Sequence, residues 1–346
     1  MSRRISGRGL AVVGGIVGLG VFVVSLRAID VTTLLHMVRR IGAAFLWVLL
    51  LAGVRLTARA AAWTSCVGGR SRLPFRAALA AVIVGEGAGN LTPLGPVASE
   101  PAKVLWVRRY VGTVEGAASL TVETVIYSIT VALMLMGGGL AWAAAFTPAR
   151  QMLAVGLCVA GAVVLAAATN ALRRSNVSGL SRVLGRLVAR ANEGTRIRAM
   201  TAWSIRTRQM LGQLLSREPR TLVTVFALEM SLQAAAVAEV WVTLVLLGVP
   251  VTFLQALLLE FANRVVTLVF KFVPLRLGVD ELGSGAMASL LGSSGTVGVA
   301  VALVRKARVV CWSAVGLALL GARALTAAQE LESAVTSGQR GNSVTA

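Results

Sequence analysis

Two stretches of the chain share one pattern: FRAALAAVIVGEGAGNLTPLGPVASE at Phe75–Glu100 and FLQALLLEFANRVVTLVFKFVPLRLGVDE at Phe253–Glu281. Both begin F-x-x-A-L, continue as an apolar segment, and then give P-L with a Glu seven residues after the Pro. The Pro breaks each apolar segment, so neither crosses a membrane comfortably as one helix. Interrupted helices expose backbone polar groups only where they line a polar cavity, and paired breaks in two halves of a chain are typical of a transporter's central site. The pattern therefore predicts a membrane translocator.

Composition places the chain among polytopic membrane proteins. Of its 346 residues, 56% are hydrophobic, and the mean hydropathy is +0.79. Uncharged runs such as Gly9–Leu26, Thr124–Ala149 and Gln151–Leu172 reach the length of about 18 residues that spans hydrocarbon. We therefore expect an all-α membrane helix bundle.

The charges of the chain point to membrane topology rather than to nucleic acid. Lys and Arg number 34 against 14 Asp and Glu, which gives a net charge of +20. Because most of these charges lie between the apolar runs and at their ends, the positive-inside rule explains much of the excess. The three cysteines are isolated and His36 is the single histidine, so we expect no disulfide framework, no metal site and no cofactor.

Apolar runs and basic clusters together predict the order of the spans. We expect a retained first helix at Gly9–Leu26, an amphipathic interfacial segment at Val31–Ile41, and spans at about 43–63, 114–137, 152–172, 221–247 and 296–320. The loop at 172–220 holds 11 Arg against Glu193 and Glu218 and is expected in the cytoplasm. It should contain an interfacial helix with one apolar face, formed by Leu180, Val183, Leu184, Leu187 and Val188. The small polar residues of 326–346 predict a disordered cytoplasmic tail.

Counting these crossings gives the repeated pattern an orientation. Phe75 should lie at the cytoplasmic face, and Phe253, one outward crossing after the basic loop, at the outer face. The two copies would then be inverted relative to each other, as in many secondary transporters. We therefore predict one integral domain over 1–325, with repeat halves at about 43–140 and 221–323 and with two broken or re-entrant segments. It would lie in the cytoplasmic (inner) membrane with both termini in the cytoplasm.

Several charges fall inside the predicted spans and in helical register. Arg55 and Arg59 are four residues apart, as are Glu260 and Arg264. Arg305 and Arg308 are three apart, and Glu123 shares a helical face with Tyr127. The remaining acidic candidates are Glu86, Glu100, Glu229, Glu239 and Glu281. Each charge at mid-bilayer costs at least about 2.5–3.5 kcal/mol, so it requires a partner or a wet cavity. The simpler explanations are that Arg55 and Arg59 snorkel to the membrane interface and that Glu260 and Arg264 form a structural pair within one helix. A cavity with more cations than anions would suit a phosphate-bearing amphiphile.

Four motifs resemble the lysylphosphatidylglycerol synthase transmembrane, or flippase-like, family. They are GNLTPLGPVASEPAKVLWVRR at 89–109, LTVET at 120–124, PLRLGVDE at 274–281 and ALVRKARVVCWSAVGL at 302–317. The last is also similar to the hopanoid-biosynthesis-associated branch, and the resemblance extends from about Val38 to Leu320. Leu94 and Leu275 stand where the family commonly has Gly, and Thr124 where many members have Arg. These departures bear on substrate identity more than on fold.

The resemblance implies lipid translocation. The family includes the membrane half of enzymes that aminoacylate phosphatidylglycerol and flip the product, and standalone proteins thought to move lipids. Because the chain ends soon after its last predicted span, we expect no soluble aminoacyl-transferase domain and no enzyme. We predict a flippase for an anionic or isoprenoid lipid, either polyprenyl-phosphate or hopanoid-like.

Two alternatives stay open. One is a noncatalytic membrane subunit of a lipid- or envelope-biosynthesis complex, which would bind a lipid-biosynthesis enzyme as its partner. The other is a membrane-embedded transferase using Glu100 or Glu281 as a base, but no D-x-D motif, His-based site or nucleotide loop accompanies those acids. The sequence therefore favours translocation over both.

Candidate headgroup-binding residues gather at the two breaks and on the helices that follow them. Glu100 and Glu281 repeat at one offset from the breaks, and Glu123 and Arg305 follow the two prolines by 30 and 31 residues. Asn90 and Gly278 have simpler explanations as a cap and a tight turn. Positive charge would come from Lys103, Arg264, Lys271, Arg276 and Arg305; balancing or proton-carrying acids would be Glu86, Glu100, Glu123 and Glu281; and Asn90, Pro93, Pro274 and Gly278 complete the predicted site.

Overall fold

The computed structural model describes most of the chain as α-helix. It covers residues 39, 41–67, 72–91, 95–145, 155–156, 158–159, 161–167, 193–216, 218–270 and 278–342. Within these ranges there is no β-strand, so the all-α prediction is confirmed. The predicted first helix at Gly9–Leu26 lies outside the described residues, and the span at 152–172 and the interfacial segment at Val31–Ile41 lie largely outside them.

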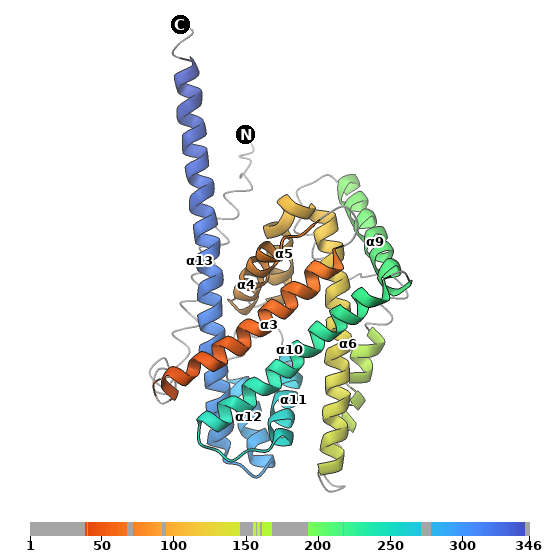
Figure 1. Ribbon diagram of the computed structural model, residues 1–346, viewed down its shortest axis with the longest axis vertical. Helices are drawn as coiled ribbons and strands as arrows, with labels where there is room; N and C mark the ends of the chain where they lie inside the picture. The colour runs from red at the N-terminus through yellow and green to blue at the C-terminus, as the bar shows by residue number, and fades with distance from the viewer. Residues whose placement is uncertain are drawn as a thin grey trace.

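Four long helices are apolar enough to cross a membrane. They are α3 (Phe45–Cys66), α6 (Thr113–Ala145), α10 (Pro219–Leu246) and α13 (Gly295–Asn342). A short 3₁₀ turn, η1 (Gly42–Ala44), precedes α3. The four spans expected at about 43–63, 114–137, 221–247 and 296–320 are thus confirmed. Helices α3 and α10 lie side by side across the centre of the molecule, between α6 and α13 (Figure 1).

Each predicted break falls between two short helices. Helix α4 (Phe75–Leu91) is followed by α5 (Gly95–Val111), and α11 (Phe253–Val269) by α12 (Val279–Leu290). The prolines at the breaks, Pro93 and Pro274, lie outside the described residues. A capping box between Thr252 and Gln255 starts α11. The order long, short, short, long therefore occurs twice along the chain.

The two short-helix pairs lie on opposite sides of α3 and α10 (Figure 1). Figure 1 shows α4 and α5 in its upper part and α11 and α12 in its lower part. Helix α4 packs against α13, and α11 against α6, so each short pair contacts the long helix that closes the other half. An inverted repeat would have this arrangement. The inverted orientation and the re-entrant path stay predictions.

Small residues let the two halves approach closely. At the contact of α4 with α13, a Cβ on Gly316 would lie 2.7 Å from the Ile83 carbonyl oxygen, and one on Gly87 would lie 3.3 Å from that of Ser313. Lipid tails are as apolar as core side chains, so close packing at small residues is a main source of attraction between membrane helices. These glycines therefore fix α13 against the first short pair.

Helix α9 (Glu193–Ser216) lies within the predicted basic loop, whereas the interfacial helix predicted around Leu180 and Val188 lies outside the described residues. Trp203 and Met210 of α9 are buried in the core that surrounds Trp63. Arg206 donates to both oxygens of Glu115, at 2.8 and 2.7 Å, and this hydrogen bonding raises the pKa of Arg206. The ion pair holds α9 against the start of α6.

Helix α13 is longer than the sequence predicted. It continues from its apolar part, Gly295–Thr326, to Asn342, where we had expected a disordered tail. The segment after Thr326 is rich in strong helix formers, including Ala327, Ala328 and Glu330, and a preceding helix provides the nucleus that such residues extend. The tail prediction is therefore corrected to helix as far as Asn342.

Candidate functional site

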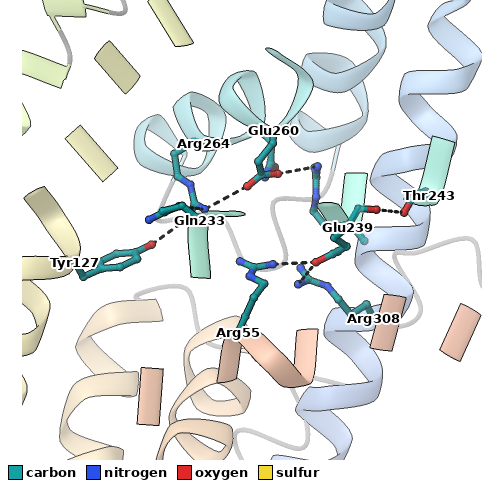
Figure 2. A network of polar contacts seen from close by, with 10 residues as sticks. Arg55, Tyr127, Gln233, Glu239, Thr243, Glu260, Arg264 and Arg308 are labelled. Carbon is teal, nitrogen blue, oxygen red and sulfur yellow. Dashed lines mark hydrogen bonds and ion pairs between the residues drawn. The ribbon is translucent and has the colours of Figure 1, made fainter. Parts of the chain in front are cut away.

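Glu239 of α10 joins the first half of the chain to the last helix. Arg55 Nη1 of α3 and Arg308 Nη1 of α13 both donate to its Oε2, at 3.0 and 2.9 Å (Figure 2). The Glu239 side chain is only 5% exposed. One buried carboxylate thus holds guanidinium groups from two helices that lie far apart in sequence.

Glu260 of α11 makes a second junction beside the first. Its Oε1 accepts from Arg264 Nη2 at 3.2 Å, and its Oε2 accepts from Arg305 Nη2 at 3.4 Å. Asn263 Nδ2 also donates to Oε2, at 3.1 Å. The predicted intrahelical pair of Glu260 and Arg264 is confirmed, but Arg305 ties it to α13 as well.

Together these two junctions carry more positive than negative charge. Four arginines face two glutamates, which leaves a net charge of +2. Each arginine also has a buried N–H group with no acceptor among the described residues: Nε of Arg55, Arg264 and Arg308, and Nη1 of Arg305. Unmatched buried donors are costly, so they favour an added acceptor. We call Arg55, Glu239, Glu260, Arg264, Arg305 and Arg308 the cationic network.

Neutral polar side chains extend the cationic network toward α6. Arg264 Nη1 donates to the Tyr127 hydroxyl at 3.1 Å, and its Nη2 donates to Gln233 Oε1 at 2.8 Å. Gln233 Nε2 in turn donates to Thr130 Oγ1 at 3.4 Å. Figure 2 shows Tyr127, Gln233 and Arg264 converging from three helices. The orientation of Arg264 is therefore set by α6 and α10 as well as by its own helix.

A second group of charges gathers between α3, α4 and α6. Arg59 Nε donates to Glu123 Oε1 at 3.0 Å, and Arg59 Nη1 donates to Glu86 Oε1 at 3.4 Å. The Glu123 side chain is fully buried. Arg59 therefore points into the protein and pairs there, which favours structural pairing over snorkelling.

Acids outnumber bases in this second group. The Lys103 side chain is 1% exposed, and its Nζ pairs with Glu100 Oε1 at 3.2 Å. Glu100 interacts electrostatically with Arg59, and Lys103 with Glu86. Glu229 of α10 is fully buried near Glu123 and has no donor among the described residues. We call Arg59, Glu86, Glu100, Lys103, Glu123 and Glu229 the acidic network.

Both networks lie near the middle of the apolar spans. Arg55 of the cationic network is close to the midpoint of Gly42–Cys66, and Glu229 of the acidic network lies within about one helical turn of the midpoint of Pro219–Leu246. Charges at this depth are rare in membrane proteins and mark substrate or ion pathways. The position of the networks therefore indicates a function in the membrane interior.

Comparison with protein families gives one match. The family model of the lysylphosphatidylglycerol synthase TM region matches residues 9–319. The chain belongs to this family. Comparisons with curated proteins and with solved structures give no match. The predicted family is confirmed, while its hopanoid-associated branch stays a prediction.

Family membership and the four apolar helices agree with each other. The lysylphosphatidylglycerol synthase TM region is a membrane domain, and the helices provide several membrane crossings. The protein is thus a multi-pass membrane protein of a lipid-related family.

Of the thirteen predicted site residues of this family member, nine lie among the described residues, and six of these belong to the two networks. Glu86, Glu100, Lys103 and Glu123 lie in the acidic network, and Arg264 and Arg305 lie in the cationic network. Pro93, Lys271, Pro274 and Arg276 lie outside the described residues.

Three predicted residues lie apart from these networks. Glu281 of α12 pairs with the buried Lys306 of α13. Gly278, with a φ of +77°, precedes the first residue of α12, so a tight turn accounts for it. Asn90 lies one residue before the end of α4.

Sequence reasoning left several network residues out of the predicted site. Six of them were recognised only as intramembrane charges: Arg55, Arg59, Glu229, Glu239, Glu260 and Arg308. Their common signal was charge within an apolar span, which identifies candidates but not which of them meet. Tyr127 shares a helical face with Glu123, whereas Gln233 had no signal at all. Their roles depend on contacts between helices far apart in sequence.

Proposed function

We propose that this protein translocates an anionic lipid across the cytoplasmic membrane, with the lipid headgroup held by the cationic network. The observation that carries the proposal is the buried excess of four arginines over two glutamates, with an unmatched N–H group on each arginine. A phosphate-bearing headgroup would supply both the missing charge and the missing acceptors.

Arginine chemistry favours phosphate over a neutral headgroup. A guanidinium presents several N–H groups in a planar fork that matches phosphate oxygens, and it stays charged when buried. The neighbouring acidic network offsets part of the net charge of +2, since Glu86 interacts with Arg55 and Arg308, but it provides no acceptor for the four unmatched N–H groups. A polyprenyl phosphate or an anionic phospholipid therefore fits the network better than an uncharged hopanoid does.

The repeated helix order supports a translocation path. Helices α3 to α6 and α10 to α13 show the same order of long and short elements, and the cationic network takes residues from both halves. Rocking of inverted halves about a central site would expose the headgroup first to one face of the membrane and then to the other. The acyl or isoprenoid chain would stay in the bilayer throughout.

Topology follows from the basic helix α9. Arg196, Arg198, Arg206 and Arg208 lie in α9 against Glu193, and basic connecting segments stay in the cytoplasm. We therefore propose that α9 lies in the cytoplasm and that, by the predicted order of the spans, both termini lie there too. The attraction of these arginines to anionic headgroups would also hold α9 at the membrane surface.

In this proposal the protein translocates a lipid and does not modify it chemically. Lipids are its expected partners, and a lipid-biosynthesis enzyme that supplies or consumes the translocated lipid would be a further one. If the chain instead acts as a noncatalytic subunit of such an enzyme, it will co-purify with that enzyme and move no lipid alone. If it is itself a transferase, purified protein will release a modified lipid.

The test is leaflet translocation in proteoliposomes with fluorescent polyprenyl phosphate, phosphatidylglycerol and phosphatidylcholine. Variants Arg308→Gln and Arg305→Gln each remove one guanidinium while leaving Glu239 with Arg55 and Glu260 with Arg264. The control, Arg206→Gln, removes an arginine outside the network. We expect wild type and the control to move the anionic probes faster than phosphatidylcholine, and both network variants to lose that preference. Equal rates for all three probes, or no movement by wild type, would overturn the proposal.

A further inference from the structure

Glu229 has an environment that an ionised carboxylate does not tolerate. Its side chain is fully buried, and neither Oε1 nor Oε2 has a hydrogen-bond donor among the described residues. Val225 and Leu232, which flank it on α10, are buried in the apolar core. Burying an unpaired carboxylate costs on the order of several kcal/mol, because the charge loses its hydration. The group is far more stable here as the neutral acid.

The nearest acidic partner of Glu229 is the Glu123 carboxyl group on α6, with which it interacts through the side chains. Glu123 already accepts from Arg59 through Oε1 at 3.0 Å and from Thr124 through Oε2 at 3.2 Å. Two carboxyl groups that interact in a buried site do not readily ionise together, because their like charges repel. A single proton between them removes that repulsion and gives Glu229 the hydrogen bond it lacks.

The other charges around the pair leave this arrangement acidic. Arg59 pairs with both Glu123 and Glu86, while Lys103 pairs with Glu100. Two bases thus face four carboxyl groups. The charged and titratable groups that interact with the pair are Arg59 and Cys66 of α3 and Lys103 of α5. Glu86 of α4 and Glu100 of α5 interact in turn with Arg59 and Lys103.

We propose that Glu123 and Glu229 form a proton-binding site, in which Glu229 is the protonated member and donates to Glu123. The bound proton would link the acidic network to headgroup binding through Arg59. That guanidinium holds Glu123 and also lies over the ring of Tyr127, whose hydroxyl accepts from Arg264 of the cationic network. If the proton is lost, the carboxyl pair becomes more negative and attracts the Arg59 guanidinium more strongly. This would change the contact between Arg59 and the Tyr127 ring. The proton-binding site does not rest on the proposed lipid translocation. The coupling of the proton to translocation does rest on it.

The first test detects the proton directly. Infrared spectra of the purified protein in nanodiscs should show the carbonyl stretch of a buried protonated carboxyl group at neutral pH, with a shift in D₂O. Glu229→Gln should lose this band, and Glu123→Gln should lose or shift it. Glu115→Gln serves as the control, because Glu115 pairs with Arg206 outside the site, and this variant should retain the band. Absence of the band from wild type, or its unchanged presence in Glu229→Gln, would overturn the proposal.

The second test asks whether the proton is used. In proteoliposomes, an imposed pH gradient should change the initial rate of anionic-lipid translocation by wild type and by Glu115→Gln, but not by Glu229→Gln. A gradient-sensitive Glu229→Gln would show that coupling runs through another group and would overturn this use of the site. If wild type moves no lipid yet shows the infrared band, the proposed translocation fails and the proton site stands.

Discussion

Arg59 and Tyr127 form the contact between the acidic and cationic networks. The Arg59 guanidinium lies 4.9 Å from the centroid of the Tyr127 ring, a geometry that favours a cation over the ring face. The hydroxyl of the same ring accepts from Arg264 at 3.1 Å. One aromatic side chain therefore contacts a guanidinium from each network, and its two contacts can be removed separately.

Replacing Tyr127 with Phe should remove only the hydroxyl. Because the lost hydrogen bond goes to a charged group, the free energy of unfolding should fall by about 1.5–3 kcal/mol. Tyr127→Leu should lose the cation–π contact as well, a further loss of about 0.5–2 kcal/mol. Unfolding in mixed detergent micelles, followed by circular dichroism, measures both variants. Equal stability of the two variants would show that Arg59 gains nothing from the ring.

Neutralising Glu239 should be severely destabilising. Glu239→Gln leaves Arg55 and Arg308 beside a neutral amide, and breaking a buried pair in this way costs about 3–5 kcal/mol. The double variant Glu239→Gln/Arg308→Met removes one of the two unbalanced charges, so it should recover part of the loss. The same unfolding measurement gives the coupling energy through a double-mutant cycle. A double variant less stable than Glu239→Gln alone would contradict the ion pairing described for α10 and α13.

The isosteric change at Glu229 should have a different outcome. Glu229→Gln should change the free energy of unfolding by less than about 1 kcal/mol, because neither Glu229 oxygen has a donor to lose. The new amide can also donate to Glu123, as the protonated acid does. Glu229→Gln and Glu239→Gln thus make the same chemical change on one helix, but only Glu239→Gln should greatly lower the free energy of unfolding. A loss for Glu229→Gln as large as that for Glu239→Gln would mean that Glu229 is an ionised, paired group.

Most of the helical architecture could be predicted from sequence. An apolar run long enough to cross the bilayer has few other stable folds, which is why α3, α6, α10 and α13 match their predicted spans. Pro93 and Pro274 likewise indicated where the short helices are interrupted. The end of α13 was predicted less well, because composition alone does not distinguish a disordered tail from a helix continued from a stable span.

The site was predicted by its residue types rather than by its contacts. A buried charge needs a partner, so Glu86, Glu123, Arg264 and Arg305 were recognisable from their apolar surroundings. Which charges meet depends on how the helices cross. For example, Arg59 and Glu123 are separated by 64 residues in sequence. Glu281 repeats the offset of Glu100, yet its partner is Lys306 of α13, whereas Glu100 pairs with a lysine on its own helix.

Lys103 depends on the absence of a side chain at Gly85. A Cβ built on Gly85 would lie 2.5 Å from Lys103 Cγ and 2.6 Å from its Cε, too close for either atom to stay in place. The lysine stem passes over α4 at this point, and its ammonium reaches Glu100 at 3.2 Å. Gly85→Ala should therefore displace the stem and weaken that ion pair, with a destabilisation of about 1–3 kcal/mol from overpacking.

Gly137→Ala provides the matched control for this prediction. Gly137 also lies within a helix, α6, but a Cβ there would meet no atom within 4 Å. Since Ala is a better helix former than Gly, this variant should be unchanged or more stable by up to about 1 kcal/mol. Unfolding in mixed micelles compares the two directly. If both variants gain stability alike, Lys103 has room to move, and the close approach of α4 to α5 does not determine where its charge lies.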